Sequence, residues 1–214
     1  MFCYHHAMAR TTGSEGSRTE EAIRHAAIDL IAARGFEATT LRELAGRVGI
    51  QPGALYRYFP SKASLLVDLQ VGHLEFLLAR WADEQPATTD PVQRLRAFVD
   101  FHIRCHTLRR KEVFVANMEL RSLAEADYRR VVGLRGRYED ILTGILHAGM
   151  AAGRFRLPDA RVATFAILAM LTGVGSWYRD GGRLGKRELI DMHTRMVVQC
   201  VGLPPDALSE EKSP

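Results

Sequence analysis

Apolar residues recur three or four positions apart along almost the whole chain, and no run shows the strict alternation that marks a β-strand. The first such stripe consists of Ile23, Ala26, Ala27, Leu30 and Ile31. Gly35 follows it and ends the helix, because glycine is favoured just past a helix C-terminus. The pattern predicts an all-α protein of about nine helices, with a small helical unit at the N-terminal end and a larger helical body behind it.

Two short helices are predicted next, separated by a tight turn. Thr40-Leu-Arg-Glu43 is a capping box, so a helix is expected over 41–48. Gly49 permits the turn, and Pro52 suits the first turn of a helix over 52–59 because its missing N–H would be unpaired there. Two short helices joined in this way match the description of a helix-turn-helix.

Helix signals continue through the rest of the chain. Ser61 and Asp90 are expected N-caps. The later helices are expected over 61–81, over 91–153 with breaks near 109–110 and 123–126, over 162–178 and over 188–201. The predicted organisation is a flexible tail at 1–17, a helix-turn-helix domain at 18–62, a larger helical domain at 63–203 and a flexible tail at 204–214.

The second short helix presents a polar outer face. Its outward residues are Gln51, Ala54, Tyr56, Arg57 and Tyr58, which suit a DNA major groove about 12 Å wide. Arg42 and Lys62 lie at helix starts, where a phosphate also meets free backbone N–H groups. A three-helix bundle with no DNA role can contain the same turn, so spacing alone leaves both interpretations open.

Charge does not decide between them. The 214 residues carry a formal net charge of +4, and the excess divides evenly between residues 1–62 and the remainder. A net charge of this size is compatible with nucleic-acid binding, but it does not show that the protein binds nucleic acid.

The sequence of the two short helices and their flanking residues resembles that of a known family. The segment GFEATTLRELAGRVGIQPGALYRYFPSK, residues 35–62, resembles the N-terminal signature of the TetR family of bacterial transcriptional regulators. The resemblance implies an all-helical homodimer with a DNA-reading unit and a ligand-binding body. It places Thr40, Tyr56 and Lys62 at phosphates and Gly53 and Ala54 close to the bases. The candidate DNA-binding residues are Thr40, Arg42, Gln51, Pro52, Gly53, Ala54, Tyr56, Arg57, Tyr58 and Lys62.

Two positions depart from the family pattern. Gln51 replaces the usual Ser or Thr before the recognition helix; it caps poorly but can pair bidentately with adenine. Tyr58 replaces a frequent His and can still donate a hydrogen bond to phosphate.

The segment 162–178 is apolar on all sides, so a helix there must be covered all round. It is shorter than the roughly 20 apolar residues of a membrane span, and no membrane association is expected. A stripe of small residues on it, with two methionines of the last helix, predicts a two-fold dimer interface; an ordinary core helix within one chain is the alternative. The candidate interface residues are Ala166, Ala169, Gly173, Ser176, Met192 and Met196.

Aromatic and methionine residues between 92 and 150 predict an apolar cavity with a few polar anchors, the usual form of a small-molecule site; an ordinary core is the alternative for each of them. The candidate ligand-binding residues are Phe98, Phe101, His102, Cys105, Phe114, Met118, Arg121, Tyr138, Leu142, Phe165, Leu168 and Trp177. His102 and His106 could share a metal, but no nearby carboxylate completes the site, so no metal and no cofactor are expected.

A second, shorter resemblance concerns the ligand. Trp177-Tyr-Arg-Asp-Gly-Gly-Arg-Leu184 resembles a stretch of those TetR-family regulators of fatty-acid and sterol breakdown that respond to acyl-CoA thioesters. It makes an acyl-CoA thioester the expected effector, with Arg104, Arg109 and Arg110 available for its phosphates; those arginines can equally form a solvated face.

The sequence therefore predicts a cytoplasmic, homodimeric repressor that leaves a palindromic double-stranded DNA operator when a small hydrophobic effector binds. A TetR-type regulator that senses a drug-like or other non-CoA ligand is the first alternative. A helical enzyme, for which no nucleotide-binding or hydrolase motif is present, and a non-sensing architectural DNA-binding protein are remote alternatives. Three scattered cysteines and the lack of a signal peptide in the first ten residues fit a reducing compartment.

Overall fold

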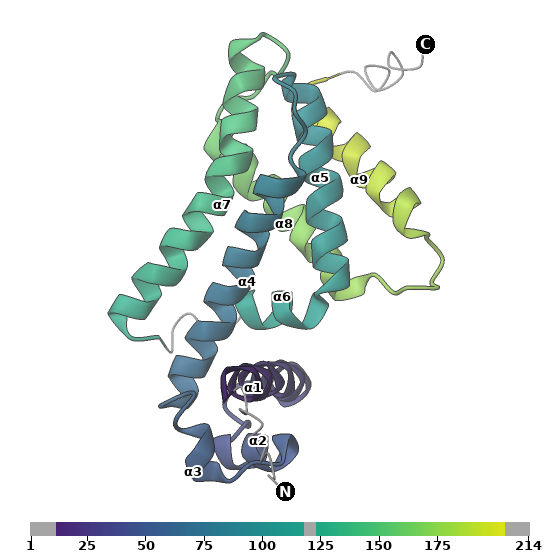
Figure 1. The fold of residues 1–214 in the computed structure, drawn as a ribbon. Helices are drawn as coiled ribbons and strands as arrows, with labels where there is room; N and C mark the ends of the chain where they lie inside the picture. Colours follow the sequence, from purple (N-terminus) through teal and green to yellow (C-terminus); the bar gives the residue numbers. More distant parts are fainter. Residues whose placement is uncertain (1–11, 118–122, 204–214) are drawn as a thin grey trace, which may run out of the picture. The chain divides into compact units, whose positions relative to one another are not determined.

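The computed structural model describes residues 12–117 and 123–203, and within these ranges the regular structure is helical throughout (Figure 1). The prediction of an all-α fold is confirmed. The described helices are α1 (Thr12–Arg34), α2 (Leu41–Val48), α3 (Pro52–Leu55), α4 (Lys62–Glu84), α5 (Pro91–Leu108), α6 (Arg110–Asn117), α7 (Glu125–Ala151), α8 (Ala160–Trp177) and α9 (Lys186–Cys200).

The chain forms two compact units, residues 1–69 and residues 70–214, which we call the front unit and the body. The boundary lies inside α4 and not at its start, as 18–62 and 63–203 had implied. Helix α1 begins at Thr12, so it includes residues 12–17 of the predicted N-terminal tail. The remainder of both predicted tails lies outside the described residues.

The three helices of the front unit close around a small aliphatic core. Ile23, Ala27, Leu30 and Ile31 of α1 are buried, as are Leu44, Ala45, Leu55 and Phe59. Thr40 caps α2, its Oγ1 accepting from the amide of Glu43 at 3.2 Å. Gly49 ends α2 with φ 76°, a left-handed conformation that glycine adopts without strain.

Helix α3 is shorter than predicted. It ends at Leu55, and residues 56–58 continue as a turn in which the amides of Arg57 and Tyr58 donate to the carbonyls of Ala54 and Leu55 at 3.2 and 2.9 Å. Pro60 explains the difference, because a residue that precedes proline avoids the helical region and the chain must tighten before it.

Expected caps hold the following helices. The Oγ of Ser61 accepts from the amide of Ser64 at 2.9 Å, and the amide of Ser61 donates to Ser64 Oγ at 3.0 Å. Asp90 accepts from the amides of Val92 and Gln93. The starts of α8 and α9 fall two residues earlier than predicted, in α8 because the Asp159 carboxylate caps it by accepting from the Val162 amide at 2.8 Å.

Helix α5 runs through the centre of the body and packs against α7, α8 and α9 (Figure 1). The ring of Trp81 packs edge-on against the rings of Phe98 and Phe101, with centroids 5.2 and 5.4 Å apart. Gly149 of α7 lies directly against the ring of Phe155, leaving no room for a side chain and fixing the chain reversal that follows α7. This aromatic centre positions the polar groups described below.

Helix α8 buries only one side against its own chain. Thr164, Ile167, Leu171 and Val174 face the core. By length and composition α8 is also the one described helix that could cross a membrane. Its other side is exposed in the single chain. The body therefore covers only one face of this apolar helix.

Candidate functional site

The turn that follows α2 exposes the polar residues predicted to contact DNA. Gln51, Pro52, Gly53 and Arg57 are exposed, Ala54 and Tyr58 are half-buried, and Tyr56 is 53% exposed. Gln51 occupies the N-cap position of α3 without a side-chain hydrogen bond, as its poor capping ability predicts. Pro52 has no amide hydrogen and the Ala54 amide donates to the Gln51 carbonyl at 2.9 Å, so these two positions offer no donor to another acceptor.

The arginines of the front unit divide into two groups. Arg24, Arg34 and Arg47 pair with carboxylates: Arg24 with Asp68 at 2.7 Å and with Glu20, Arg34 with Glu43, and Arg47 with Asp29 at 3.6 Å. Arg42 and Arg57 are exposed and have no ion-pair partner among the described residues. Arg18 of α1 is likewise exposed without an ion pair to a described residue, so unneutralised charge lies on α1, on α2 and on the turn after α3, and phosphate contact was predicted at the last two.

Lys62 has a role that the sequence did not indicate. Its Nζ donates to the carbonyls of Phe36 and Glu37 at 2.7 and 3.2 Å and lies 4.2 Å from the centre of the Phe36 ring. The ammonium thus ties the loop after α1 to the first turn of α4. An ammonium has three protons, and the one that these carbonyls do not use lies near the Glu37 carboxylate, whose Oε2 is 3.8 Å from Nζ.

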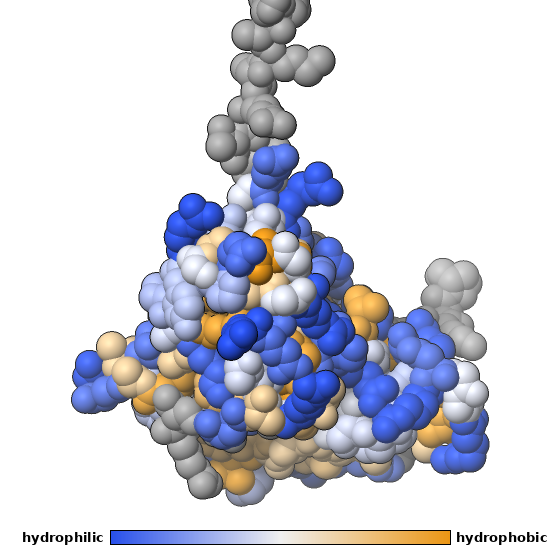
Figure 2. All heavy atoms as spheres, turned by 90° about the horizontal axis from the view of Figure 1, so that it is seen from below, coloured by the Kyte–Doolittle hydropathy of each residue, from blue (hydrophilic) through white to orange (hydrophobic). Residues whose placement is uncertain are grey.

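The surface in Figure 2 is largely hydrophilic, with hydrophobic residues in small separate patches. A different kind of surface lies on α8 and α9. All six candidate interface residues are exposed in the single chain: Ala166, Ala169, Gly173, Ser176, Met192 and Met196. Val162 of α8 is 64% exposed. These residues form what we call the apolar face.

The body contains a cavity of about 270 Å³, near the lower limit for small-molecule pockets. One part of its lining is apolar and the other polar. The apolar residues are Leu74, Leu77, Ala116, Phe165, Leu168 and Ala169. The polar residues are His73, His102, His106, Asn117, Arg135, Tyr138, Glu139 and Thr172.

His102 stands at the centre of the polar part. Its Nδ1 lies 3.0 Å from Tyr138 Oη and its Nε2 lies 3.1 Å from Thr172 Oγ1. The ring of His106 stacks on it with centroids 3.7 Å apart, and the ring of His73 meets His106 edge-on at 6.0 Å. We call His73, His102 and His106 the histidine cluster.

Burial keeps the histidine cluster neutral. It lowers the pKa of His73 to about 3, with the charges of His106 and Arg109 adding to the effect. It lowers the pKa of His106 to about 4, against the opposing hydrogen bond to the His102 carbonyl. The pKa of His102 falls well below its ordinary value, and burial raises the pKa of Tyr138 well above its own. The cavity therefore presents uncharged imidazoles at neutral pH.

Four of the predicted ligand-binding residues line this cavity: His102, Tyr138, Phe165 and Leu168. Four others are buried beside it and do not line it, namely Phe98, Phe101, Cys105 and Leu142. Phe114 is exposed, and Trp177 lines a separate hollow of about 260 Å³ with residues 178, 179 and 182–184. Met118 and Arg121 lie outside the described residues.

Sequence reasoning missed His73 and considered His106 only as a metal ligand. A buried histidine at position 73 is signalled by its place on the apolar side of α4, between Leu69, Leu74 and Leu77. The stacked rings of His102 and His106 do not converge on one point. Within the described ranges no group of three His, Cys, Asp or Glu side chains could hold a metal.

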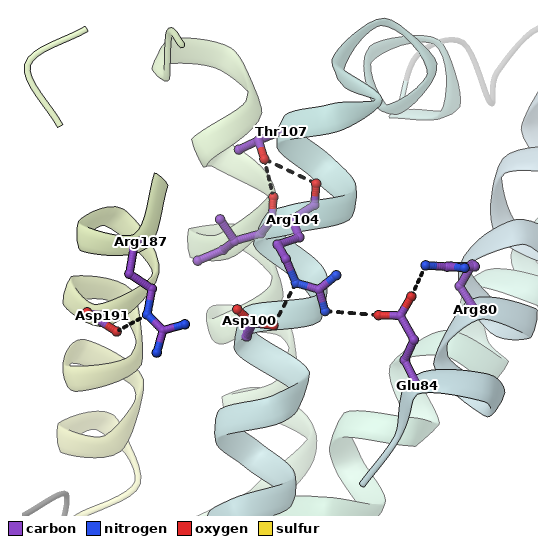
Figure 3. Close-up of polar contacts among 8 residues, drawn as sticks. Arg80, Glu84, Asp100, Arg104, Thr107, Arg187 and Asp191 are labelled. Atoms are coloured by element: carbon purple, nitrogen blue, oxygen red, sulfur yellow. Dashed lines mark hydrogen bonds and ion pairs between the residues drawn. The ribbon is translucent and has the colours of Figure 1, made fainter. Parts of the chain in front are cut away.

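The arginines considered for CoA phosphates all have partners within the chain. Figure 3 shows Arg104 between two carboxylates, with its Nε 2.7 Å from Asp100 Oδ2 and its Nη2 3.0 Å from Glu84 Oε2. Arg80 pairs with the same Glu84, so the network joins α4 to α5.

The other two arginines are similarly engaged. Arg109 Nε donates to Glu112 Oε1 at 3.2 Å, and its guanidinium lies 4.1 Å from the centre of the Phe76 ring. Arg110 Nε donates to the carbonyl of Gly175 at 2.8 Å. Arg104 and Arg109 are therefore paired with carboxylates, whereas Arg110 is bonded to a carbonyl and keeps its charge.

Comparison with known proteins bears on the chain as a whole. The HTH-type transcriptional repressor KstR2 of Mycobacterium tuberculosis (strain H37Rv) is 29% identical over 194 residues, 89% of this chain and 96% of the relative. A tetR-family regulatory protein from Rhodococcus RHA1 has a TM-score of 0.82 at 28% identity, over 87% of this chain and 98% of that one. The ketosteroid transcriptional regulator KstR2 of Mycobacterium tuberculosis has a TM-score of 0.75 at 26% identity, over 85% and 93%.

Family models match both units. The model for bacterial regulatory proteins of the tetR family matches residues 23–69, which include α2 and α3. The model for a tetracyclin repressor-like C-terminal domain matches residues 88–201, more than half of the chain. With its helix-turn-helix in front and an all-helical body behind, the chain belongs to the tetR family of bacterial regulatory proteins.

Proposed function

We propose that this protein is a homodimeric transcriptional repressor that binds a palindromic DNA operator in the cytoplasm and leaves it when a small hydrophobic effector enters the body. The observation that carries the proposal is the placement of charge in the front unit. Arg42 and Arg57 lack carboxylate partners among the described residues, and they flank the exposed turn that contains Gln51 and Tyr56. The family is one of regulators and not of enzymes.

The operator contacts follow from this surface. Arg42, Arg57, Tyr56 and Tyr58 reach phosphates, as do Thr40 and Lys62, and these contacts fix the register on the duplex. Gln51, Pro52, Gly53 and Ala54 come closest to the base edges, where the Gln51 amide suits adenine. Repression, as opposed to activation, is supported by the similarity to KstR2 of Mycobacterium tuberculosis, a transcriptional repressor.

The apolar face is the proposed dimer interface. Six exposed small or methionine side chains on α8 and α9 allow two copies to approach closely, and the isologous contact of two such faces generates two-fold symmetry. Two copies of the front unit can then meet successive half-sites about 34–36 Å apart.

The effector enters the cavity lined by α4, α5, α7 and α8. Binding there shifts the equilibrium between spacings of the two front units, and an effector that prefers the non-binding spacing weakens operator affinity by its differential free energy, about 1–3 kcal/mol. An acyl-CoA thioester remains the proposed effector, supported by the 177–184 segment, whose exposed Trp177 and Arg183 border the second hollow.

A second effector class is favoured by one observation. Arg104 and Arg109 are paired with Asp100 and Glu112, so two of the three arginines considered for CoA phosphates are already neutralised. A hydrophobic molecule without CoA does not need those contacts, and the name of the ketosteroid transcriptional regulator KstR2 suggests a ketosteroid as one such molecule.

The test begins with selection of bound sequences from random double-stranded DNA. We expect one palindromic site, and we expect Tyr56→Phe to weaken it about three- to tenfold through the loss of one hydrogen bond to phosphate. Tyr128→Phe is the matched control, because Tyr128 is an exposed tyrosine of the body. Recovery of no preferred sequence, or equal affinity of both variants, would overturn the DNA-binding assignment.

The effector class is tested on the selected operator with decanoyl-CoA, decanoate, free CoA and cholest-4-en-3-one. Release by decanoyl-CoA alone supports the thioester. Release by the ketosteroid without CoA supports the second class, and release by free CoA alone contradicts both.

A further inference from the structure

The polar part of the cavity has more hydrogen-bonding capacity than the protein uses. His102 uses both ring nitrogens, on Tyr138 and Thr172. A neutral imidazole has one N–H and one lone pair, so His102 donates to one of these hydroxyls and accepts from the other. The hydroxyl that accepts from His102 keeps its own hydrogen. Since both residues line the cavity, one O–H donor is left for a bound molecule.

His106 offers the complementary group. Its Nδ1 lies 2.9 Å from the carbonyl oxygen of His102. A carbonyl only accepts, so Nδ1 carries the hydrogen and Nε2 is left with a lone pair in the neutral ring. Because His106 lines the cavity and has this fixed tautomer, it serves a ligand as an acceptor.

His73 adds a group without a partner. It is 95% buried, its ring lines the cavity, and its Nδ1 has no hydrogen-bond partner among the described residues. A buried polar atom left in this way costs about 1–3 kcal/mol. A ligand group beside the ring relieves that cost if it can either donate or accept.

The charged residues of the wall are occupied. Arg135 Nη2 donates to the Ala116 carbonyl at 3.1 Å, and Glu139 pairs with Arg161 at 2.8 Å. Arg135 keeps its positive charge, because a carbonyl does not neutralise a guanidinium, whereas the histidine cluster presents uncharged imidazoles.

We propose that the effector carries a neutral hydroxyl group, alcoholic or phenolic, on its hydrophobic part, and that His106, Tyr138 and Thr172 bind this hydroxyl beside His73. The inference rests on the proposed function, since it names the class of molecule that this effector cavity recognises. A hydroxyl donates to His106 Nε2 while accepting from the free O–H of Tyr138 or Thr172. A ketone or a carboxylate only accepts, so either group leaves His106 Nε2 unpaired.

The histidine cluster is the specificity element in this proposal. His106 touches the ligand. His102 is a positioning residue, because it orients the hydroxyls of Tyr138 and Thr172 without contributing a free group itself. The apolar residues on the opposite wall, such as Leu77, Phe165 and Leu168, receive the hydrocarbon.

Four naphthalene probes of nearly equal size test the proposal by equilibrium dialysis at pH 7.5: 2-naphthol, naphthalene, 2-acetonaphthone and 2-naphthoate. We expect 2-naphthol to bind about three- to tenfold more tightly than each of the others, the worth of one net hydrogen bond. Equal affinities, a preference for 2-naphthoate or 2-acetonaphthone, or no binding of 2-naphthol would overturn the inference.

Variants test whether the histidine cluster causes the preference for 2-naphthol. His106→Phe keeps a ring but removes the acceptor, and the preference for 2-naphthol should fall below twofold; His106→Gln supplies a carbonyl acceptor and should restore part of it. Tyr138→Phe gives a second reading if the first variant does not fold. His193→Phe is the matched control, because His193 is also buried and bonded to the carbonyl four residues earlier, at 2.8 Å from Leu189, but does not line the cavity.

Operator binding is measured on the same preparations. A wild-type protein that binds its operator but shows no preference for 2-naphthol contradicts this inference and leaves the proposed repressor intact. A protein that prefers 2-naphthol but binds no operator contradicts the proposed function instead.

Discussion

The front unit and the body place their polar side chains differently: the front unit exposes them, whereas the body buries several. The front unit keeps them at its surface, where Arg24, Arg34 and Arg47 pair with carboxylates and Thr40 caps a helix. Within its described residues the only buried polar side chain is that of Thr39. The body buries four histidines, His73, His102, His106 and His193, and exposes an apolar face.

The difference fits what each unit would contact. A surface that reads DNA must offer hydrogen bonds and positive charge to water-exposed phosphates, so its polar groups stay outside. A cavity that binds a hydrophobic molecule gains selectivity from a few buried polar groups. A ligand that leaves one of these groups without a hydrogen bond binds more weakly, because the group has no water to replace the missing partner. Four predictions test this contrast, from the largest expected effect to the smallest.

Acid should destabilise the body most. The histidines of an unfolded chain bind protons near pH 6.5, whereas the folded pKa is about 4 for His106 and about 3 for His73. Between these values the unfolded state binds more protons, so the free energy of unfolding falls as pH drops. We expect a loss of about 1 kcal/mol per pH unit for each of the two histidines between roughly pH 6 and pH 4.

Tryptophan fluorescence during urea unfolding measures this effect in the body, because both tryptophans, Trp81 and Trp177, lie there. The variant His106→Phe should show a shallower dependence on pH. A wild-type free energy of unfolding that is constant from pH 7 to pH 4 would contradict the neutral histidine cluster.

Gly173→Leu should break the dimer without harming the chain. A Cβ at Gly173 meets no other atom within 4 Å in the single chain, so the leucine has free space there. In a close two-fold contact it would overpack the interface at about 1–3 kcal/mol per copy. Sedimentation equilibrium should show a dissociation constant raised at least about tenfold.

Gly133→Leu is its control, an exposed glycine of α7 where an added Cβ also meets nothing within 4 Å. If Gly173→Leu sediments like the wild type, the apolar face is not where two copies meet.

Lys62→Met should destabilise the front unit by about 1–2 kcal/mol, since the carbonyls of Phe36 and Glu37 lose their charged donor. Hydrogen exchange of the Gly35 amide, which donates to Ile31 at the end of α1, reports the loss. Lys186→Met, which removes only an exposed pairing with Asp180, is the control. Unchanged exchange would show that Lys62 does not support the loop after α1.

Gln51→Ser should stabilise the front unit slightly, by about 0.5 kcal/mol, because serine can supply the N-cap bond that Gln51 does not make. Thermal unfolding followed by circular dichroism measures the shift. Gln85→Ser, at an exposed position after α4, is the control. A lower melting temperature for Gln51→Ser would indicate that α3 is held by contacts other than its cap.

Local signals predicted most of the fold. Thr40, Ser61 and Asp90 begin helices in the structure as their side-chain chemistry required. The length of α3 was not predictable from its apolar spacing, because the tightening before Pro60 and the burial of Phe59 decide where it ends. The division of contacts between residues 69 and 70 was not predictable, because helix α4 continues through it without a break in its pattern.

The cavity was only partly predictable. His102 and Tyr138 were recognisable as polar residues on apolar helix faces, and both line it. Phe98 and Leu142 have the same periodicity and are core residues, because a helix face that points inward can meet either a cavity or another side chain. The partners of Arg104 come from α4 and α5 together, a tertiary pairing that no single-helix pattern reports.

The half-covered helix α8 has a consequence for the amount of protein in the cell. If a second copy supplies the missing cover, the stability of each chain rises with the concentration of chains, because association draws on the folded form alone. A newly made chain at low abundance would then be the form most exposed to proteases. Below a minimum number of copies per cell, the protein would then be mostly monomeric, and it would neither persist nor repress.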